Sequence, residues 1–130
     1  MDRWNRLLAA AAANVLVAIA AGAFGAHGLE GRIDAHRLDI WETAARYHVY
    51  GGLGMALCAV VAKLGIGGAM RAGWVMQAGA AIFAISLYVL AASGVKVLGA
   101  ITPIGGALTI IGWAMLAVAA WRARADHRGG

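Results

Sequence analysis

The side chains of this sequence that could take part in chemistry gather between residues 27 and 50. Glu42 and Arg46 are four residues apart and can pair across one helical turn. Neutral imidazole is a common ligand of metals and haem iron, so His27 and His48 would form such a site if the fold placed them together. The alternative is that both histidines hydrogen-bond to carbonyls or lipid headgroups at a membrane surface. The whole polar cluster, which we expect at the outer interface of a membrane, comprises His27, Trp41, Glu42, Arg46, Tyr47, His48 and Tyr50.

Motifs that carry catalysis or cofactors are absent from the sequence. It has no HExxH, CxxC or CxxCH motif, no P-loop, and no GxGxxG pattern opening a βαβ unit. The lone Cys58 excludes an internal disulfide. We therefore expect no enzyme activity, no catalytic residues and no cofactor, and a metal or haem site is kept only as an alternative.

The segments that must position the polar cluster are four long apolar stretches. Of 130 residues, 62% are apolar and only 13% are charged, more apolar surface than so small a domain can hide from water. A bilayer core of about 30 Å needs roughly 20 apolar residues per helix, and these runs lack the alternation of membrane strands. We predict an all-α polytopic membrane protein, a single domain over residues 1–130 whose four transmembrane helices pack as an antiparallel bundle. The predicted spans are about 6–26, 45–64, 72–92 and 102–121.

The connection between the first two spans is predicted to hold a short helix at the outer membrane interface. Its apolar positions recur at a spacing near 3.6 residues, which indicates one helical face. An irregular polar loop is the alternative. The positions on that face are Leu29, Ile33, His36, Ile40 and Ala44.

The start of the last span is predicted at Thr102 and Pro103. Threonine is a good N-cap residue, and proline is tolerated at the first helical position because its missing N–H has no partner there. The sequence therefore predicts a helix that begins at this pair.

The formal net charge of +5 indicates orientation rather than nucleic-acid binding, because the basic residues lie at the ends of the spans. Seven Lys and Arg residues flank the N-terminus, the connection 65–71 and the C-terminus, whereas the other two connections hold four. Since cytoplasmic loops carry an excess of Lys and Arg, both termini are predicted to be cytoplasmic. The expected partner is the lipid bilayer, and no nucleic acid is expected.

Glycines recur inside the apolar runs and are predicted to form helix-packing contacts. In lipid, helices associate through close approach of their backbones, which small residues permit. At the end of the first span we also expect His27 to hydrogen-bond across to Glu42, Tyr47 or Tyr50 and so lock the turn. The predicted packing glycines are Gly22, Gly25, Gly51, Gly54, Gly105, Gly106 and Gly112.

Several motifs resemble one family of small membrane proteins. They are GAFGAHGL (residues 22–29), W-x-T-A (41–44), RYHVY (46–50), SLYVLAASG (86–94), ITPIGG (101–106) and IGW (111–113). Together they resemble the domain of unknown function 423 family, over nearly the whole chain from Gly22 to Trp121. The resemblance implies a four-helix protein of the bacterial inner membrane and supplies no biochemical activity.

Three functions are compatible with these observations. The first is a compact membrane module that acts by helix packing, binding a membrane-protein partner or a further copy of itself. The second is an oligomeric channel or carrier for a small solute, lined by Asn14, Gln77 and Thr109; it loses support if these residues hydrogen-bond within one four-helix unit. The third is a metal or haem protein that uses His27 and His48.

Overall fold

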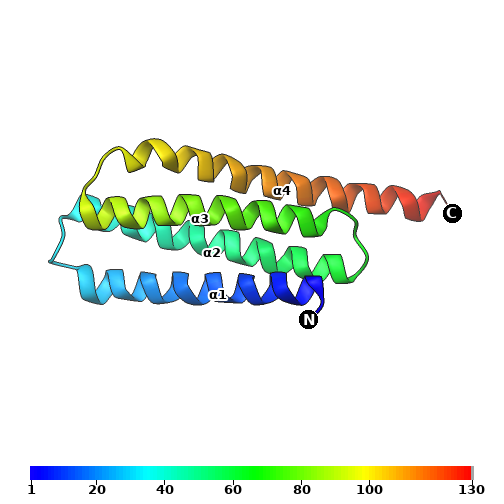
Figure 1. The fold of residues 1–130 in the computed structure, drawn as a ribbon, viewed down its shortest axis with the longest axis horizontal. Coiled ribbons are helices and arrows are strands. Elements are labelled where there is room, and N and C mark those ends of the chain that lie inside the picture. Colours follow the sequence, from blue (N-terminus) through cyan, green and yellow to red (C-terminus); the bar gives the residue numbers. More distant parts are fainter. Residues whose placement is uncertain (130) are drawn as a thin grey trace.

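The computed structural model describes residues 1–129, except for the side chains of His127 and Arg128, and is helical along nearly all of this range. Four helices, α1 (Arg3–Phe24), α2 (Ala35–Lys63), α3 (Ala69–Ser93) and α4 (Leu98–Arg128), follow one another, and a π-helical turn, η1 (Gly25–Leu29), extends α1. Consecutive helices run in opposite directions (Figure 1). Both chain termini and residues 64–68 therefore lie at one end, the terminal end, and residues 30–34 and 94–97 lie at the far end. The predicted all-helical architecture with four helices is confirmed.

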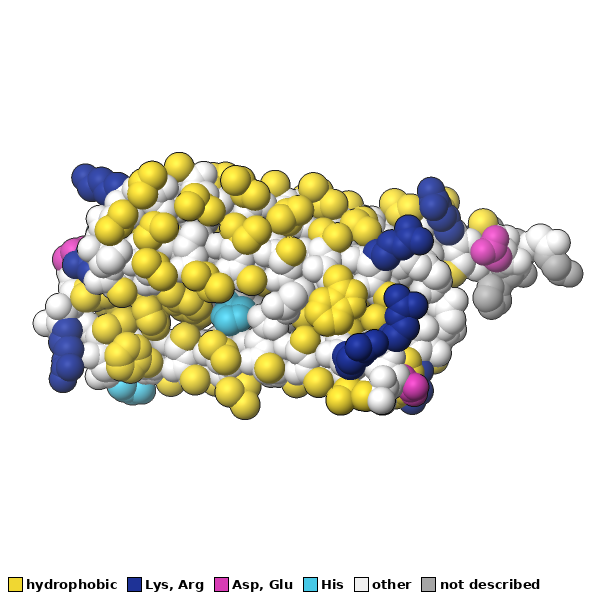
Figure 2. Space-filling model, in the orientation of Figure 1, with side chains coloured by type: hydrophobic (Ala, Val, Ile, Leu, Met, Phe, Trp, Pro, Cys, Tyr) yellow, Lys and Arg dark blue, Asp and Glu magenta, His cyan; other side chains and the backbone are white. Residues whose placement is uncertain are grey.

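Three helical stretches are long and apolar enough to cross a membrane. They are Arg3–Leu29, Ala69–Ser93 and Leu98–Asp126, with mean hydropathies of 2.2, 1.9 and 1.8. Helix α2 is as long, with 29 residues, but its first turns carry the charged side chains of Arg37, Asp39, Glu42 and Arg46. In Figure 2 hydrophobic side chains cover the middle of the visible face, and Lys and Arg side chains lie towards its two ends.

The four helices form an open zigzag rather than a closed bundle. Helices α2 and α3 pack against each other in the middle, α1 packs mainly on α2, and α4 packs mainly on α3. Within residues 1–129, α1 and α4 make no contact. This order leaves two lengthwise grooves on opposite faces: the α1/α3 groove, which has α2 as its floor, and the α2/α4 groove, which has α3 as its floor.

Backbone-to-backbone contact at glycines sets the spacing of α3 and α4. A Cβ atom on Gly79 would lie 2.5 Å from the backbone nitrogen of Thr109, and one on Gly105 would collide with the backbone of Phe83. Neither contact can relax by rotating a side chain, so only glycine fits at these two positions. Gly105 is one of the predicted packing glycines, and Gly79 is not.

The remaining predicted packing glycines differ in how closely they are packed. A Cβ on Gly51 would lie 2.6 Å from Ala80 Cβ of α3, and one on Gly54 would lie 2.6 Å from Met76 Sδ. A Cβ on Gly112 would collide with the side chain of Met76. At Gly22 and Gly106 the nearest atoms would be at ordinary contact distances of 3.8 and 3.6 Å.

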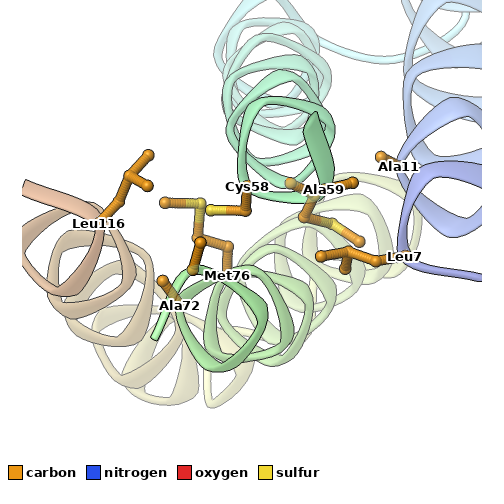
Figure 3. Packing of buried hydrophobic residues seen from close by; sticks show 9 residues of the cluster. Leu7, Ala11, Cys58, Ala59, Ala72, Met76 and Leu116 are labelled. Carbon is orange, nitrogen blue, oxygen red and sulfur yellow. The ribbon is translucent and has the colours of Figure 1, made fainter. Parts of the chain in front are cut away.

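The apolar core lies in the half of the molecule nearer the terminal end. Its members come from all four helices (Figure 3). Leu7, Met55, Met76 and Cys58 are its largest fully buried side chains, and alanines fill the spaces between them. Small core residues draw the helices together at this end, and polar contacts join them farther along.

Two expectations about helix ends are wrong. The expected interfacial helix is not a separate element: Leu29 belongs to η1 and Ile33 to the connection, and the later part of the segment is the start of α2, which is continuous from Ala35. Asp34 caps α2 by accepting a hydrogen bond from the Arg37 backbone N–H at 2.9 Å. Helix α4 begins at Leu98, so Thr102 is not its N-cap: the Thr102 hydroxyl donates back to the Leu98 carbonyl at 3.1 Å. Turn-type hydrogen bonds from Leu98, Gly99 and Ala100 to carbonyls three residues earlier start the helix ahead of Pro103.

Candidate functional site

Polar side chains from three helices meet beneath the α1/α3 groove. His48 of α2 is 8% exposed, and its Nε2 lies 2.9 Å from Asn14 Oδ1 of α1. The other ring nitrogen, Nδ1, lies 3.2 Å from the hydroxyl of Tyr88 on α3. Asn14 in turn donates to Gln77 Oε1 of α3 at 2.7 Å. We call Asn14, His48, Gln77 and Tyr88 the polar network.

The hydrogen bonds of the polar network run in one direction. The Asn14 amide nitrogen donates both to Gln77 and, at 2.8 Å, to the Ala10 carbonyl, so its oxygen is left to accept from His48. His48 is then the neutral tautomer with its proton on Nε2, and Nδ1 accepts from the Tyr88 hydroxyl. The chain of donors runs from Tyr88 through His48 and Asn14 to Gln77.

Glycine in α2 allows this network to form. Asn14 is the twelfth of the 22 residues of α1, and His48 is the fourteenth of the 29 residues of α2, so both lie near the middle of their helices. A Cβ on Gly52 would lie 2.7 Å from Val15 Cγ2 and 3.3 Å from the Ala11 carbonyl oxygen. Because Gly52 has no side chain, α1 approaches α2 closely enough for Asn14 to reach His48.

The α1/α3 groove has a volume of about 320 Å³, and the polar network forms the polar part of its lining. Gln77 is half-buried, and its amide nitrogen donates to no group among the described residues. That nitrogen ends the chain of donors and remains available for an acceptor. Besides the network, the groove is lined by Ala13, Val17, Ala81, Ala84 and Ile85.

Trp41 joins the far end of α1 to the polar network. Its indole N–H donates to the Ala21 carbonyl at 2.7 Å, and its ring centroid lies 4.7 Å from that of Tyr88. A Cβ on Gly25 would lie 2.7 Å from Trp41 Cδ1, so the glycine leaves space for the indole. Gly28 leaves similar space for the Phe24 ring, where a Cβ would lie 2.6 Å from two ring carbons. Two of the three glycines of GAFGAHG, Gly25 and Gly28, therefore accommodate aromatic rings.

Arg37 stabilises the end of α3 that carries Tyr88. Its Nε donates to the Ala91 carbonyl at 2.6 Å, and its Nη2 donates to the Ala92 carbonyl. Carbonyls in the last turn of a helix have no partner within it and carry the negative end of the helix dipole. The guanidinium donates hydrogen bonds to these carbonyls and places a positive charge at the negative end of the dipole, and it thereby links the start of α2 to the end of α3.

The residues of the predicted polar cluster lie on different faces of the molecule. Trp41 and His48 lie at the polar network, whereas Glu42 and Arg46 are exposed and form no ion pair within residues 1–129. Tyr47 and Tyr50 line the α2/α4 groove, which has a volume of about 460 Å³. In this groove the Tyr47 ring lies 5.2 Å, between centroids, from the Phe83 ring.

The expected hydrogen bond from His27 to Glu42, Tyr47 or Tyr50 is not formed. His27 is exposed in η1, and its side chain hydrogen-bonds to nothing in the described part of the chain. The π-helical turn sets its side chain at the surface, and at this end of α1 a hydrogen bond to α2 is made instead between the Trp41 indole and the Ala21 carbonyl. The prediction for His27 is therefore wrong, and the interhelical hydrogen bond found at this end of α1 is that of Trp41.

The hydrogen bonds of the polar network weigh against both alternative functions, a metal or haem protein and a channel or carrier. Both ring nitrogens of His48 have protein partners, so no lone pair remains for a metal or haem iron. Among the side chains that the structure describes, no three of His, Cys, Asp or Glu form a group suited to a metal ion. Asn14 and Gln77 hydrogen-bond to each other within one unit. Thr109 donates to the Gly105 carbonyl of its own helix at 2.9 Å and lines the other groove. By the criterion set from the sequence, the transport function loses support.

Two residues of the site, Tyr88 and Arg37, were not predicted from the sequence. Tyr88 carried a weak signal, since it is a polar aromatic residue within the apolar run SLYVL. Arg37 carried none, because the carbonyls that it binds lie 54 and 55 residues farther along the chain.

The sequence matches one protein family and several related membrane proteins. The family described as "Protein of unknown function (DUF423)" matches residues 21–106. The UPF0382 membrane protein YwdK of Bacillus subtilis is 50% identical over 111 residues, covering 84% of this chain and 90% of that protein. The UPF0382 membrane protein SAB0533 of Staphylococcus aureus is 46% identical over 111 residues, covering 85% and 91%. No solved structure matches.

Proposed function

Because this chain belongs to the DUF423 family of membrane proteins, as its motifs predicted, we propose that it is a membrane-embedded binding module whose α1/α3 groove receives a transmembrane helix. The occupant is a helix with small residues at the contact and a hydrogen-bond acceptor placed opposite Gln77. It belongs to a membrane-protein partner or to a further copy of this chain. The role is one of binding rather than catalysis.

The unpaired donor of Gln77 is the observation that carries this proposal. An exposed amide N–H of a soluble protein is satisfied by water, but hydrocarbon offers no acceptor, and an unsatisfied donor there costs free energy. Gln77 lies on a helix apolar enough to span the membrane and lines the groove, and its amide nitrogen has no partner among the described residues. An acceptor from outside the chain removes this cost.

The lining of the groove fits a helix as the source of that acceptor. Ala81 and Ala84 of α3 and Ala13 of α1 flank the polar network. Side chains this small allow a third backbone to approach closely, and polar side chains in such seams hydrogen-bond between helices. The groove has a volume of about 320 Å³, and the three alanines in its lining are positions where a helix lying along it can approach closely.

The proposal includes four membrane crossings in the bacterial inner membrane, with both termini in the cytoplasm. Helices α1 and α3 run in the same direction, so α2 must return the chain to the terminal end between them (Figure 1). After its charged first turns, α2 has no charged residue from Tyr47 to Ala62. The excess of Lys and Arg at the terminal end favours the cytoplasm for that end.

The size of the assembly in native membranes tests the proposal. Wild-type chain extracted with a membrane-solubilising polymer is expected to run as a complex, and Gln77→Leu is expected to run largely as a monomer because the interhelical hydrogen bond is lost. The matched control is Thr109→Val, which also removes a polar group from a span but loses only a bond within α4. Wild-type chain that is monomeric, or a complex that Gln77→Leu leaves intact, would overturn the proposal.

A further inference from the structure

The terminal end carries a basic pocket between α3 and α4 that the proposed function does not use. It has a volume of about 360 Å³ and lies on the side of α4 that packs against the start of α3. Two arginines line it, Arg71 from the first turn of α3 and Arg122 from near the end of α4. We call it the arginine pocket.

Neither arginine has an anionic partner among the residues that the structure describes. Both are exposed, and neither forms an ion pair or a side-chain hydrogen bond within the described chain. The loop residues Gly67 and Gly68, just before α3, also line the pocket, so the positive end of the α3 dipole adds to the charge of the guanidinium groups. The mouth of the pocket is therefore complementary to an anion such as a phosphate group, which arginine binds in a bidentate manner.

The floor of the pocket is apolar and runs along α4 towards the middle of the molecule. Ile111, Met115 and Val118 follow the i, i+4, i+7 spacing of one helical face, and Ile111 and Val118 are 48% and 50% exposed. From Arg122 to Ile111 the helix rises about 16 Å, at about 1.5 Å per residue. That length matches one leaflet of the hydrocarbon core, which is about 15 Å deep.

From this geometry we propose that the arginine pocket binds an anionic diacyl phospholipid, with the phosphate between Arg71 and Arg122 and an acyl chain along Ile111, Met115 and Val118. A soluble phosphate compound would need the arginines but not the apolar floor, whereas a zwitterionic lipid would need the floor and gain little from two guanidinium groups. Basic pockets between membrane helices bind anionic headgroups by this combination of charge and apolar contact. The inference is independent of the α1/α3 groove, which lies between different helices.

Native mass spectrometry of the full chain in detergent tests the inference. The probes are phosphatidylglycerol, phosphatidylcholine with the same acyl chains, and glycerol 1-phosphate as the free headgroup phosphate. Wild-type chain is expected to bind phosphatidylglycerol most tightly and glycerol 1-phosphate hardly at all. The double variant Arg71→Gln/Arg122→Gln is expected to lose roughly 30-fold in affinity for phosphatidylglycerol, the change expected for removing two basic contacts to an anionic lipid.

Two matched variants separate the pocket from general surface charge. Arg3→Gln/Arg124→Gln removes the same charge from the same end but outside the pocket, so its loss of affinity should be much smaller. Ala114→Phe places a ring in the lining without altering charge, and it is expected to weaken the binding of phosphatidylglycerol. Arg71→Lys/Arg122→Lys keeps the charge but loses the bidentate geometry, so its affinity for phosphatidylglycerol should lie between those of the wild-type chain and the glutamine double variant. It also provides a loss of affinity to measure if the glutamine variant fails to fold.

Three results would contradict the proposed lipid site. Equal losses in the two glutamine double variants would assign the effect to overall charge, and equal affinity for phosphatidylglycerol and phosphatidylcholine would remove the role of the arginines. Competition by glycerol 1-phosphate at similar concentration would indicate a site for a soluble phosphate. Each of these results overturns the proposed lipid site.

Discussion

Asn14 Oδ1 of α1 and His48 Nε2 of α2 are joined by a hydrogen bond of 2.9 Å near the middle of both helices. This bond has two consequences. It fixes the tautomer of His48, so that Nδ1 is turned to Tyr88 of α3, and it turns the Asn14 amide nitrogen towards Gln77. One pair of side chains thereby links three helices and leaves Gln77 as the terminal donor that faces the groove.

Replacing His48 with Leu is expected to destabilise the protein by about 1–2 kcal/mol, because two interhelical hydrogen bonds are lost and those in membrane proteins are worth about 0.6 kcal/mol on average and at most about 1.7. Unfolding of the purified chain by titrated denaturing detergent measures the change. The control is His27→Leu, which should leave stability unchanged because His27 is exposed and has no hydrogen bond in the described chain. Equal effects of the two substitutions would argue against the polar network.

Replacing Arg37 with Gln is expected to loosen the last turn of α3 and to cost about 1 kcal/mol, since it removes a charged partner of the Ala91 and Ala92 carbonyls. Hydrogen–deuterium exchange should rise in residues 88–94 and remain unchanged in α1. Arg46→Gln, an equal change of charge on the same helix at an exposed site, serves as the control. Unaltered exchange at the end of α3 would show that the cap contributes nothing.

Replacing Gly105 with Ala is expected to separate α3 from α4 at a cost of about 2 kcal/mol or more, because the new methyl group would meet the Phe83 backbone. The adjacent Gly106→Ala is the matched control, since its Cβ would lie 3.6 Å from the Phe83 ring. Thermal melting in detergent compares the two variants. If both melt at the same temperature, the close contact at Gly105 does not determine the helix spacing.

Hydropathy predicted the order, the number and the approximate positions of the helices, because burial in lipid requires long apolar runs whatever their neighbours are. It could not predict the start of α4. Thr102 and Pro103 resemble a helix start in isolation, but turn-type bonds between residues 95 and 100 begin the helix earlier and Pro103 falls in its second turn.

The candidate site could be predicted less completely from the sequence, because its contacts join residues that lie far apart along the chain. Asn14 and Gln77 were identified as polar residues within spans, yet their mutual contact bridges 63 positions. Trp41 was assigned to the membrane interface, where an indole is common, but Gly25 opens space for it against α1. Such contacts depend on which helices are neighbours, and helix order along the chain does not decide between a closed bundle and the zigzag seen in this fold.

Photocrosslinking from Ala81 in living membranes tests the proposed binding groove most directly. A diazirine-bearing side chain of leucine size at Ala81 lies beside Gln77 in the groove lining, and the same side chain at Leu57, exposed on α2, provides the comparison. We predict a discrete protein–protein adduct from position 81, lost in the Gln77→Leu background, and only lipid adducts from position 57. Lipid or small-molecule adducts alone from position 81 would contradict a helix in this groove.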